Sequence, residues 1–134
     1  MKKGIVTGAF DLLHAGHAHF IEQCEKRCDY LIVALHIDPS IERSTKNKPI
    51  ENIVERQIKL VNQIGVKNIW IYQTESELKL LFQYLKPDVR FLGSDYADLD
   101  KKVLVTDPDA IPIEYIDSLP IHTSDIRERI KNAG

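Results

Sequence analysis

Residues 3–36 follow a strand–helix–strand pattern, which is the strongest indication of the fold. Residues 3–7, Lys-Gly-Ile-Val-Thr, are a short β-rich run that ends at Gly8. From Gly16 to about Arg27 the apolar residues keep helical spacing. Residues 30–36, Tyr-Leu-Ile-Val-Ala-Leu-His, then form a continuous apolar run, which is typical of a strand covered on both faces of a sheet. This stretch predicts two parallel strands joined by a crossover helix.

The alternation of strands and helices continues along the rest of the chain. Apolar residues at helical spacing predict a second helix that begins at Val54 and stops at Gly65, and a third that ends before Pro87. Pro112 lacks an N–H, which predicts a sheet edge or a strand start at this point. The sequence therefore predicts one α/β domain over residues 1–134, with a five-stranded parallel sheet and helices on both faces. The remaining elements are strands at residues 68–72, 89–92 and 111–116 and a last helix at 123–131.

Composition narrows the class of protein. A length of 134 residues suits one domain, and a hydrophobic content of 43% excludes disorder. The net charge of -2 argues against a general nucleic-acid coat, yet it leaves a local pocket for an anionic nucleotide open. No apolar stretch approaches the roughly 18 residues of a membrane span. Cys24 and Cys28 fit reduced, partly buried thiols. We therefore expect a cytoplasmic protein with no membrane span and no nucleic-acid partner.

Two histidines beside a glycine mark the expected site. Ligands of open parallel sheets bind beyond the carboxyl ends of the strands. The loop after the first predicted strand holds His14 and His17 around Gly16, where a helix begins. The N–H groups of a helix start attract phosphate, and imidazoles can donate further hydrogen bonds to it, more strongly when protonated. Two alternatives are that the histidines only cap the helix or lie on the surface, and that they bind a transition metal together with His19.

Two other phosphate-binding motifs are absent from the sequence. The chain has neither G-x-x-x-x-G-K-[ST] nor a G-x-G-x-x-G after the first strand. P-loop chemistry is therefore excluded and dinucleotide redox chemistry is disfavoured.

The first loop carries a family resemblance. Gly8-Ala9-Phe10-Asp11, followed by His14-Ala15-Gly16-His17, resembles the G-x-F-D-x-x-H-x-G-H signature of the cytidylyltransferase-like nucleotidyltransferases. By length and element order the chain is most similar to the glycerol-3-phosphate cytidylyltransferases, and heptose-phosphate adenylyltransferases and archaeal FAD synthetases are similar in the same regions. The resemblance covers essentially the whole chain. It implies a Rossmann-like fold and a homodimer.

The resemblance also implies a site for a nucleoside triphosphate. His14 and His17 are expected to contact the triphosphate, and Lys46 resembles a mobile-loop lysine that reaches the phosphates, so these three are the expected catalytic residues. Mg²⁺ is the expected cofactor, bound mainly through the nucleotide phosphates, with no residue expected as a metal ligand. The expected nucleotide-binding residues are Gly8, Ala9, Phe10, Gly16, Arg56, Gly93, Asp95, His122, Thr123, Ser124 and Arg127.

Several side chains have a second interpretation. Asp11 caps the first helix or orients a neighbouring group. Asp95 either lies near the base or ribose of a nucleotide or only completes a turn. Arg127 either assists in binding the phosphates or has no part in it. Lys79 is better explained as a solvated lysine than as a ligand of the acceptor, and Trp70 as a core or interface residue.

The function that the resemblance implies is transfer of CMP from CTP to a small phosphorylated acceptor, such as glycerol-3-phosphate, with release of pyrophosphate. The chain departs from that pattern at three positions. Ala9 stands where a threonine is usual, His122 replaces the first serine of an I-S-T-T segment, and Ser94 stands where an aspartate is frequent. The alternatives are an adenylyltransferase that uses ATP and a heptose-phosphate or FMN acceptor, and a nucleotide-binding module without turnover.

Overall fold

The computed structural model describes residues 1–94, 111–117 and 128–132. Strands and helices alternate in them as the sequence predicts, and residues 128–132 are helical, whereas the expected start of the last helix near Thr123 lies outside the described residues. The elements are β1 (Lys3–Gly8), α1 (Ala15–Glu25), β2 (Tyr30–His36), α2 (Ile53–Lys59), the π-helix η1 (Leu60–Ile64), β3 (Ile69–Tyr72), α3 (Glu75–Leu85), β4 (Val89–Gly93) and β5 (Ile113–Ile116).

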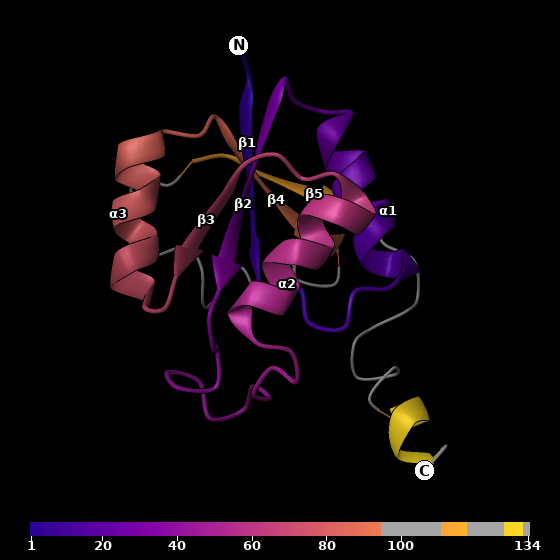
Figure 1. Cartoon of the computed structure of the whole chain (residues 1–134). Helices are drawn as coiled ribbons and strands as arrows, with labels where there is room; N and C mark the ends of the chain where they lie inside the picture. The colour runs from indigo at the N-terminus through magenta and orange to yellow at the C-terminus, as the bar shows by residue number, and fades with distance from the viewer. Residues whose placement is uncertain (95–110, 118–127, 133–134) are drawn as a thin grey trace.

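The described strands form a five-stranded sheet in the order β3-β2-β1-β4-β5, and every neighbouring pair is parallel (Figure 1). This confirms the predicted α/β, Rossmann-like sheet. The strand order reverses between β1 and β4, and the carboxyl ends of these two strands are therefore the expected binding edge. β5 lies at one edge of the sheet and begins directly after Pro112, as the missing N–H of proline predicts.

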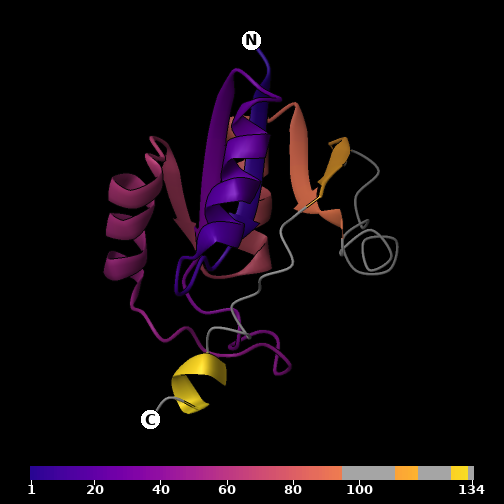
Figure 2. The same ribbon diagram turned by 90° about the vertical axis from the view of Figure 1, so that its right-hand side faces the viewer.

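Helices cover both faces of the sheet, as predicted. Alternate residues of β1 point to opposite faces, so Val6 belongs to one core cluster and Ile5 to the other. The Val6 cluster includes Ile21 of α1 and Leu60 of η1, whereas the Ile5 cluster includes Leu78 of α3. Figures 1 and 2 show α1 and α2 on one side of the sheet and α3 on the other.

Local chemistry explains how these elements begin and approach one another. α1, α2 and α3 each start with a capping box, in which a side chain satisfies an otherwise unpaired N–H of the first turn. Gly65 has a φ of 84° and stops the helix that runs from α2 through η1, as predicted. At Gly4 a Cβ would lie 2.4 Å from Cε2 of Phe91, so β1 and β4 pack as they do only without a side chain there.

Candidate active site

The two histidines of the expected site build the first turn of α1. His14 is the N-cap of the helix, and its Nδ1 accepts a hydrogen bond from Gly16 N at 3.0 Å. Nδ1 of His17 accepts a hydrogen bond from His14 N at 3.2 Å, which completes the capping box. The rings stack with their centroids 4.0 Å apart. The structure thus confirms that the two histidines meet at a helix start, and also the alternative that they cap it.

These hydrogen bonds fix which ring nitrogen carries the proton. Because each Nδ1 accepts from a main-chain N–H, each neutral ring holds its proton on Nε2. In each ring, Nδ1 accepts the hydrogen bond that caps the helix, and the Nε2–H donor lies on the other side of the imidazole. Nε2 of His14 is buried, so a phosphate oxygen that accepts its hydrogen bond has to bind below the surface of the site.

His17 is neutral at physiological pH. Burial, followed by the nearby His14 ring, lowers the pKa of His17 from 6.5 to about 4, while Asp11 acts in the opposite direction. A second proton on the ring would also remove the Nδ1 acceptor that His14 N uses. The structure therefore favours a neutral donor at His17 over the protonated donor that would bind phosphate more strongly.

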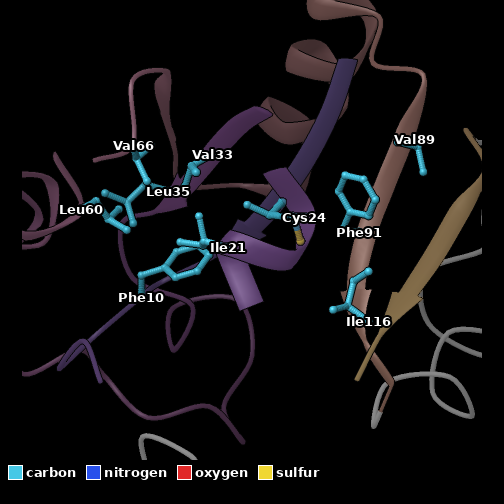
Figure 3. Close-up of a cluster of buried hydrophobic side chains, with 11 residues drawn as sticks. Phe10, Ile21, Cys24, Val33, Leu35, Leu60, Val66, Val89, Phe91 and Ile116 are labelled. Atoms are coloured by element: carbon cyan, nitrogen blue, oxygen red, sulfur yellow. The ribbon is translucent and has the colours of Figure 1, made fainter. Parts of the chain in front are cut away.

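Phe10 supports the ring of His17 from the core. Its side chain is 8% exposed and packs in the cluster that contains Ile21 (Figure 3). The Phe10 and His17 ring centroids lie 5.7 Å apart. A Cβ on Gly8 would lie 3.3 Å from the Phe10 ring, so the missing side chain leaves room for that ring beside the end of β1. That Phe10 contacts a nucleotide stays a prediction.

Arg56 ties together segments that are distant in the sequence. Its side chain is 2% exposed. Its Nη1 donates to the carbonyl oxygens of Ala9 and His36, at 3.0 and 2.6 Å. Its Nη2 donates to Ile37 O and its Nε to Glu51 O. The sequence predicts a nucleotide ligand at Arg56, but here the guanidinium is directed at main-chain carbonyls. It holds the carboxyl ends of β1 and β2 against the start of α2.

Two buried carboxylates join the loop after β1 to the segment before α2. Asp11 accepts hydrogen bonds from the main-chain N–H groups of Ile50 and Glu51, at 2.8 and 2.9 Å. Glu51 in turn accepts one from Leu12 N at 2.7 Å and forms an ion pair with Lys59. Asp11 is thus not a cap of α1 but an acceptor that holds a neighbouring segment. Sequence reasoning missed Glu51, because no motif marks a single glutamate whose partner lies 39 residues away.

The polar segment 37–50 presents Lys46 at the surface. Near its start, Asp38 N donates to Oε1 of Gln73 at 3.0 Å, and Nε2 of Gln73 donates to Asp38 O at 2.9 Å. Lys46 N donates to Arg43 O at 3.0 Å, and the Lys46 residue is exposed. The segment is therefore anchored near its start and carries an exposed lysine further on. That Lys46 reaches phosphates stays a prediction.

Two of the predicted glycines end neighbouring strands of the sheet, and the third lies in the first turn of α1. Gly8 ends β1 and Gly93 ends β4, and these two strands are neighbours in the sheet. Gly16 is buried in the first turn of α1. The described part of the expected site thus gathers at the carboxyl ends of β1 and β4. The other predicted nucleotide-binding residues, namely Asp95, His122, Thr123, Ser124 and Arg127, lie outside the described residues.

Trp70 and Lys79 lie outside the part of the expected site at the carboxyl ends of β1 and β4. Trp70 is 38% exposed on the edge strand β3, with its ring 5.8 Å from that of Tyr84. The core interpretation of Trp70 is therefore wrong, because an edge strand leaves one flank of the sheet uncovered. Lys79 is exposed on α3.

The described side chains of the site include donors that suit phosphate. Within residues 1–94, 111–117 and 128–132, no group of three or more histidine, cysteine, aspartate or glutamate residues could hold a metal ion. His14 and His17 offer Nε2–H donors, which bind oxygen anions and not cations.

Both cysteines are free thiols, as expected. Cys24 is buried and Cys28 is half-buried. Burial, reinforced by the nearby Cys28, raises the pKa of Cys24 to about 12, which leaves that thiol unreactive. None of the described helices has the length and apolar character of a membrane span.

A parallel sheet with a histidine-capped helix start at its switch point is typical of nucleotide-binding α/β proteins. Comparison with known families agrees with this class of protein and identifies the family within it. Residues 5–129 match the family described as cytidylyltransferase-like. The chain belongs to this family of nucleotidyltransferases, which confirms the resemblance seen in its first loop.

Curated relatives of the chain are longer proteins. The bifunctional protein HldE of Campylobacter jejuni subsp. jejuni serotype O:6 is 33% identical over 134 residues, which cover 98% of this chain and 28% of HldE. HldE of Helicobacter pylori strain HPAG1 is 38% identical over 99 residues, covering 73% of this chain and 21% of that protein. The chain thus spans about a quarter of the length of these relatives.

Solved structures share the fold. The lipopolysaccharide core biosynthesis protein of Thermoplasma volcanium superposes with a TM-score of 0.69 at 26% identity, over 89% of this chain and 98% of that one. Pantothenate synthetase of Thermus thermophilus superposes with a TM-score of 0.59 at 13% identity, over 98% of this chain and 64% of that one. The second likeness is one of fold alone.

Proposed function

We propose that the protein transfers a nucleotidyl group from a nucleoside triphosphate to the phosphate of a small acceptor and releases pyrophosphate. One observation carries this proposal. Two stacked imidazoles, both with the proton on Nε2, stand at the amino end of α1, beside the point where the strand order reverses. A triphosphate placed there meets two neutral donors and the positive end of the helix dipole.

The reaction needs no protein nucleophile. An anionic oxygen of the acceptor phosphate attacks the α-phosphorus, a new P–O bond forms, and the bond from the α-phosphorus to the bridging oxygen breaks. Pyrophosphate leaves with that electron pair from the opposite side. Positioning and charge stabilisation then account for the rate. The Nε2–H groups of His14 and His17 would stabilise the α-phosphate and the bridging oxygen, and Lys46 would close over the phosphates.

Mg²⁺ is proposed to bind through the phosphates of the nucleotide. When bound, it would neutralise charge on the triphosphate and so favour the departure of pyrophosphate. The described residues of the site are donors that fit the triphosphate itself, so the chain's share of the work is to hold and orient the phosphates.

Two nucleoside triphosphates, CTP and ATP, are candidate donors of the transferred nucleotidyl group. CMP transfer to a glycerol-3-phosphate-like acceptor rests on the motif in the first loop. AMP transfer to a heptose-phosphate-like acceptor is supported by the similarity to the HldE proteins and to a lipopolysaccharide core biosynthesis protein. The alanine at position 9 departs from the glycerol-3-phosphate pattern, which has threonine there. We therefore propose ATP and a sugar phosphate as the first pair to test.

Pyrophosphate release separates these pairs. The purified chain is incubated with Mg²⁺ and either ATP or CTP over a panel of phosphorylated acceptors that includes heptose phosphate, glycerol-3-phosphate and FMN. We expect release that requires both a triphosphate and one acceptor. His14→Ala and His17→Ala should each lower kcat by about 10²–10³-fold, because each removes a preorganised donor. His19→Ala, on the same helix but outside the capping box, is the matched control.

Two other outcomes would redirect the proposal. Tight triphosphate binding in calorimetry, with no release of pyrophosphate for any acceptor, would indicate the binding module without turnover. Near-wild-type turnover by both histidine variants would refute the roles assigned to the imidazoles.

A further inference from the structure

The loop that carries the two histidines is held in a strained conformation. Phe10 and Leu12 adopt φ values of 50° and 49°, in the left-handed region that residues with a side chain rarely occupy. Leu12 lies two residues before His14, the N-cap of α1. Something outside the loop must therefore hold this backbone in place, because the local preferences of these residues do not.

Glu51 makes the contact that holds Leu12. Its Oε1 accepts a hydrogen bond from Leu12 N at 2.7 Å, and the residue is only 8% exposed. A charged acceptor in a buried position makes this a strong hydrogen bond. Lys59, the last residue of α2, forms the ion pair that compensates the buried charge of Glu51.

The bond from Glu51 is one half of a reciprocal clamp. Asp11, from the histidine loop, accepts hydrogen bonds from the main chain of Ile50 and Glu51. Glu51 accepts one from the main chain of that same loop. Residues 50 and 51 end the polar segment that presents Lys46. The clamp therefore joins the backbone before His14 to the backbone that follows Lys46.

We propose that Glu51, with Lys59 as its counter-ion, is a positioning residue that sets the His14–His17 pair for the transfer reaction. The inference rests on the proposed function, and it adds to it a residue that touches neither nucleotide nor acceptor. Glu51 acts through Leu12 N: it keeps the strained turn closed, and the closed turn delivers His14 to the start of α1 with the Nδ1 atoms of both rings facing the main chain.

The test uses a conservative change and a spectroscopic readout. Glu51→Gln keeps the shape of the side chain and removes its charge, and Lys59→Gln removes the counter-ion while Glu51 stays. Imidazole ¹⁵N NMR then reports the tautomers of His14 and His17 without any nucleotide. We expect both rings of the wild type to be Nε2–H, and Glu51→Gln to give averaged tautomer signals. The exposed pair Glu22–Lys26 on α1 supplies the matched controls Glu22→Gln and Lys26→Gln.

Kinetics distinguishes positioning from general destabilisation. In Glu51→Gln, kcat should fall by about 10²-fold, the size expected of a small displacement of catalytic groups, while KM for the nucleotide changes little. Leu12→Asn should restore part of kcat in the Glu51→Gln background, because asparagine tolerates the left-handed region better than leucine does. A variant that is merely less stable would not be rescued in this way.

The outcomes distinguish a failure of the Glu51 proposal from a failure of the proposed function. A folded Glu51→Gln with wild-type tautomer signals and wild-type kcat overturns the role of Glu51. If Glu51→Gln does not fold, Lys59→Gln decides, and unchanged tautomers and kcat in that variant count against the proposal. If the wild-type chain releases no pyrophosphate, the proposed function fails, while the tautomer signals still show whether Glu51 orders the histidine pair.

Discussion

Acid should destabilise this protein through His17. The residue is half-buried, and burial lowers its pKa to about 4 in the folded chain, against 6.5 for the ordinary side chain. Between these two values the unfolded chain binds a proton that the folded chain does not. The neutral His17 ring therefore contributes to the free energy of unfolding in full above pH 6.5, and this contribution is lost as the pH falls towards 4. A shift of this size corresponds to about 3 kcal/mol, at roughly 1.36 kcal/mol per pKa unit.

The informative perturbation is His17→Asn. The asparagine side-chain oxygen can replace Nδ1 as the acceptor for His14 N, so the capping box survives while the titrating ring is gone. We expect the free energy of unfolding of the wild type to fall by about 3 kcal/mol from pH 7 to pH 4 more than that of His17→Asn. Burial also lowers the pKa of His36, and this contribution is common to both proteins.

Urea unfolding, followed by circular dichroism at half-unit steps from pH 7 to pH 4, measures this difference. His19→Asn removes an imidazole from the same helix, leaves the capping box intact and should keep the acid-dependent loss. Parallel stability curves for wild type and His17→Asn would refute the reasoning, because they would mean that His17 takes up its proton equally well in the folded chain.

Three further predictions concern packing, anchoring and charge. Gly4→Ala places a Cβ against the Phe91 ring; it should lower the free energy of unfolding by about 1–3 kcal/mol in urea titrations, and Phe91→Leu in the same chain should recover part of the loss. Arg56→Lys keeps the charge but leaves buried carbonyls without donors; a loss of about 3 kcal/mol or more is expected in the same assay, and a change below about 1 kcal/mol would contradict the anchoring role. Lys46→Met should leave the unfolding midpoint unchanged, since the residue is exposed, yet lower kcat about tenfold or more; the exposed Lys67→Met is its control, and an equal effect of both changes would count against a phosphate contact by Lys46.

The sequence allowed much of the fold to be predicted, because the fold follows local patterns. The apolar run at 30–36 predicted a strand covered on both faces, and β2 is an interior strand with that burial. The missing N–H of Pro112 marked the start of an edge strand. The histidine pair was found in the same way, since its chemistry is local: a glycine and two imidazoles within one turn of a helix.

The rest of the site depends on contacts that no local pattern records. Arg56 shares a helix start with ordinary exposed residues, and only the meeting of three loops shows that its guanidinium donates to main-chain carbonyls. Glu51 is similar, because its partner at Leu12 is remote in sequence. The core alternative for Trp70 failed for the opposite reason: its apolar character suggested a core position, but burial depends on its place in the strand order, which its own segment does not encode. The interface alternative stays a prediction.

The reach of Arg56 has a consequence for how the chain acquires its binding edge. One of its hydrogen bonds joins groups 47 residues apart, so it forms only after that length of chain has closed into a loop. A nascent or partly folded chain that has completed only the first strand and helix already contains both imidazoles, but Arg56 does not yet hold the ends of β1 and β2 against the start of α2. We therefore expect the chain to become able to bind a ligand when α2 docks, and not as soon as the histidine motif has formed.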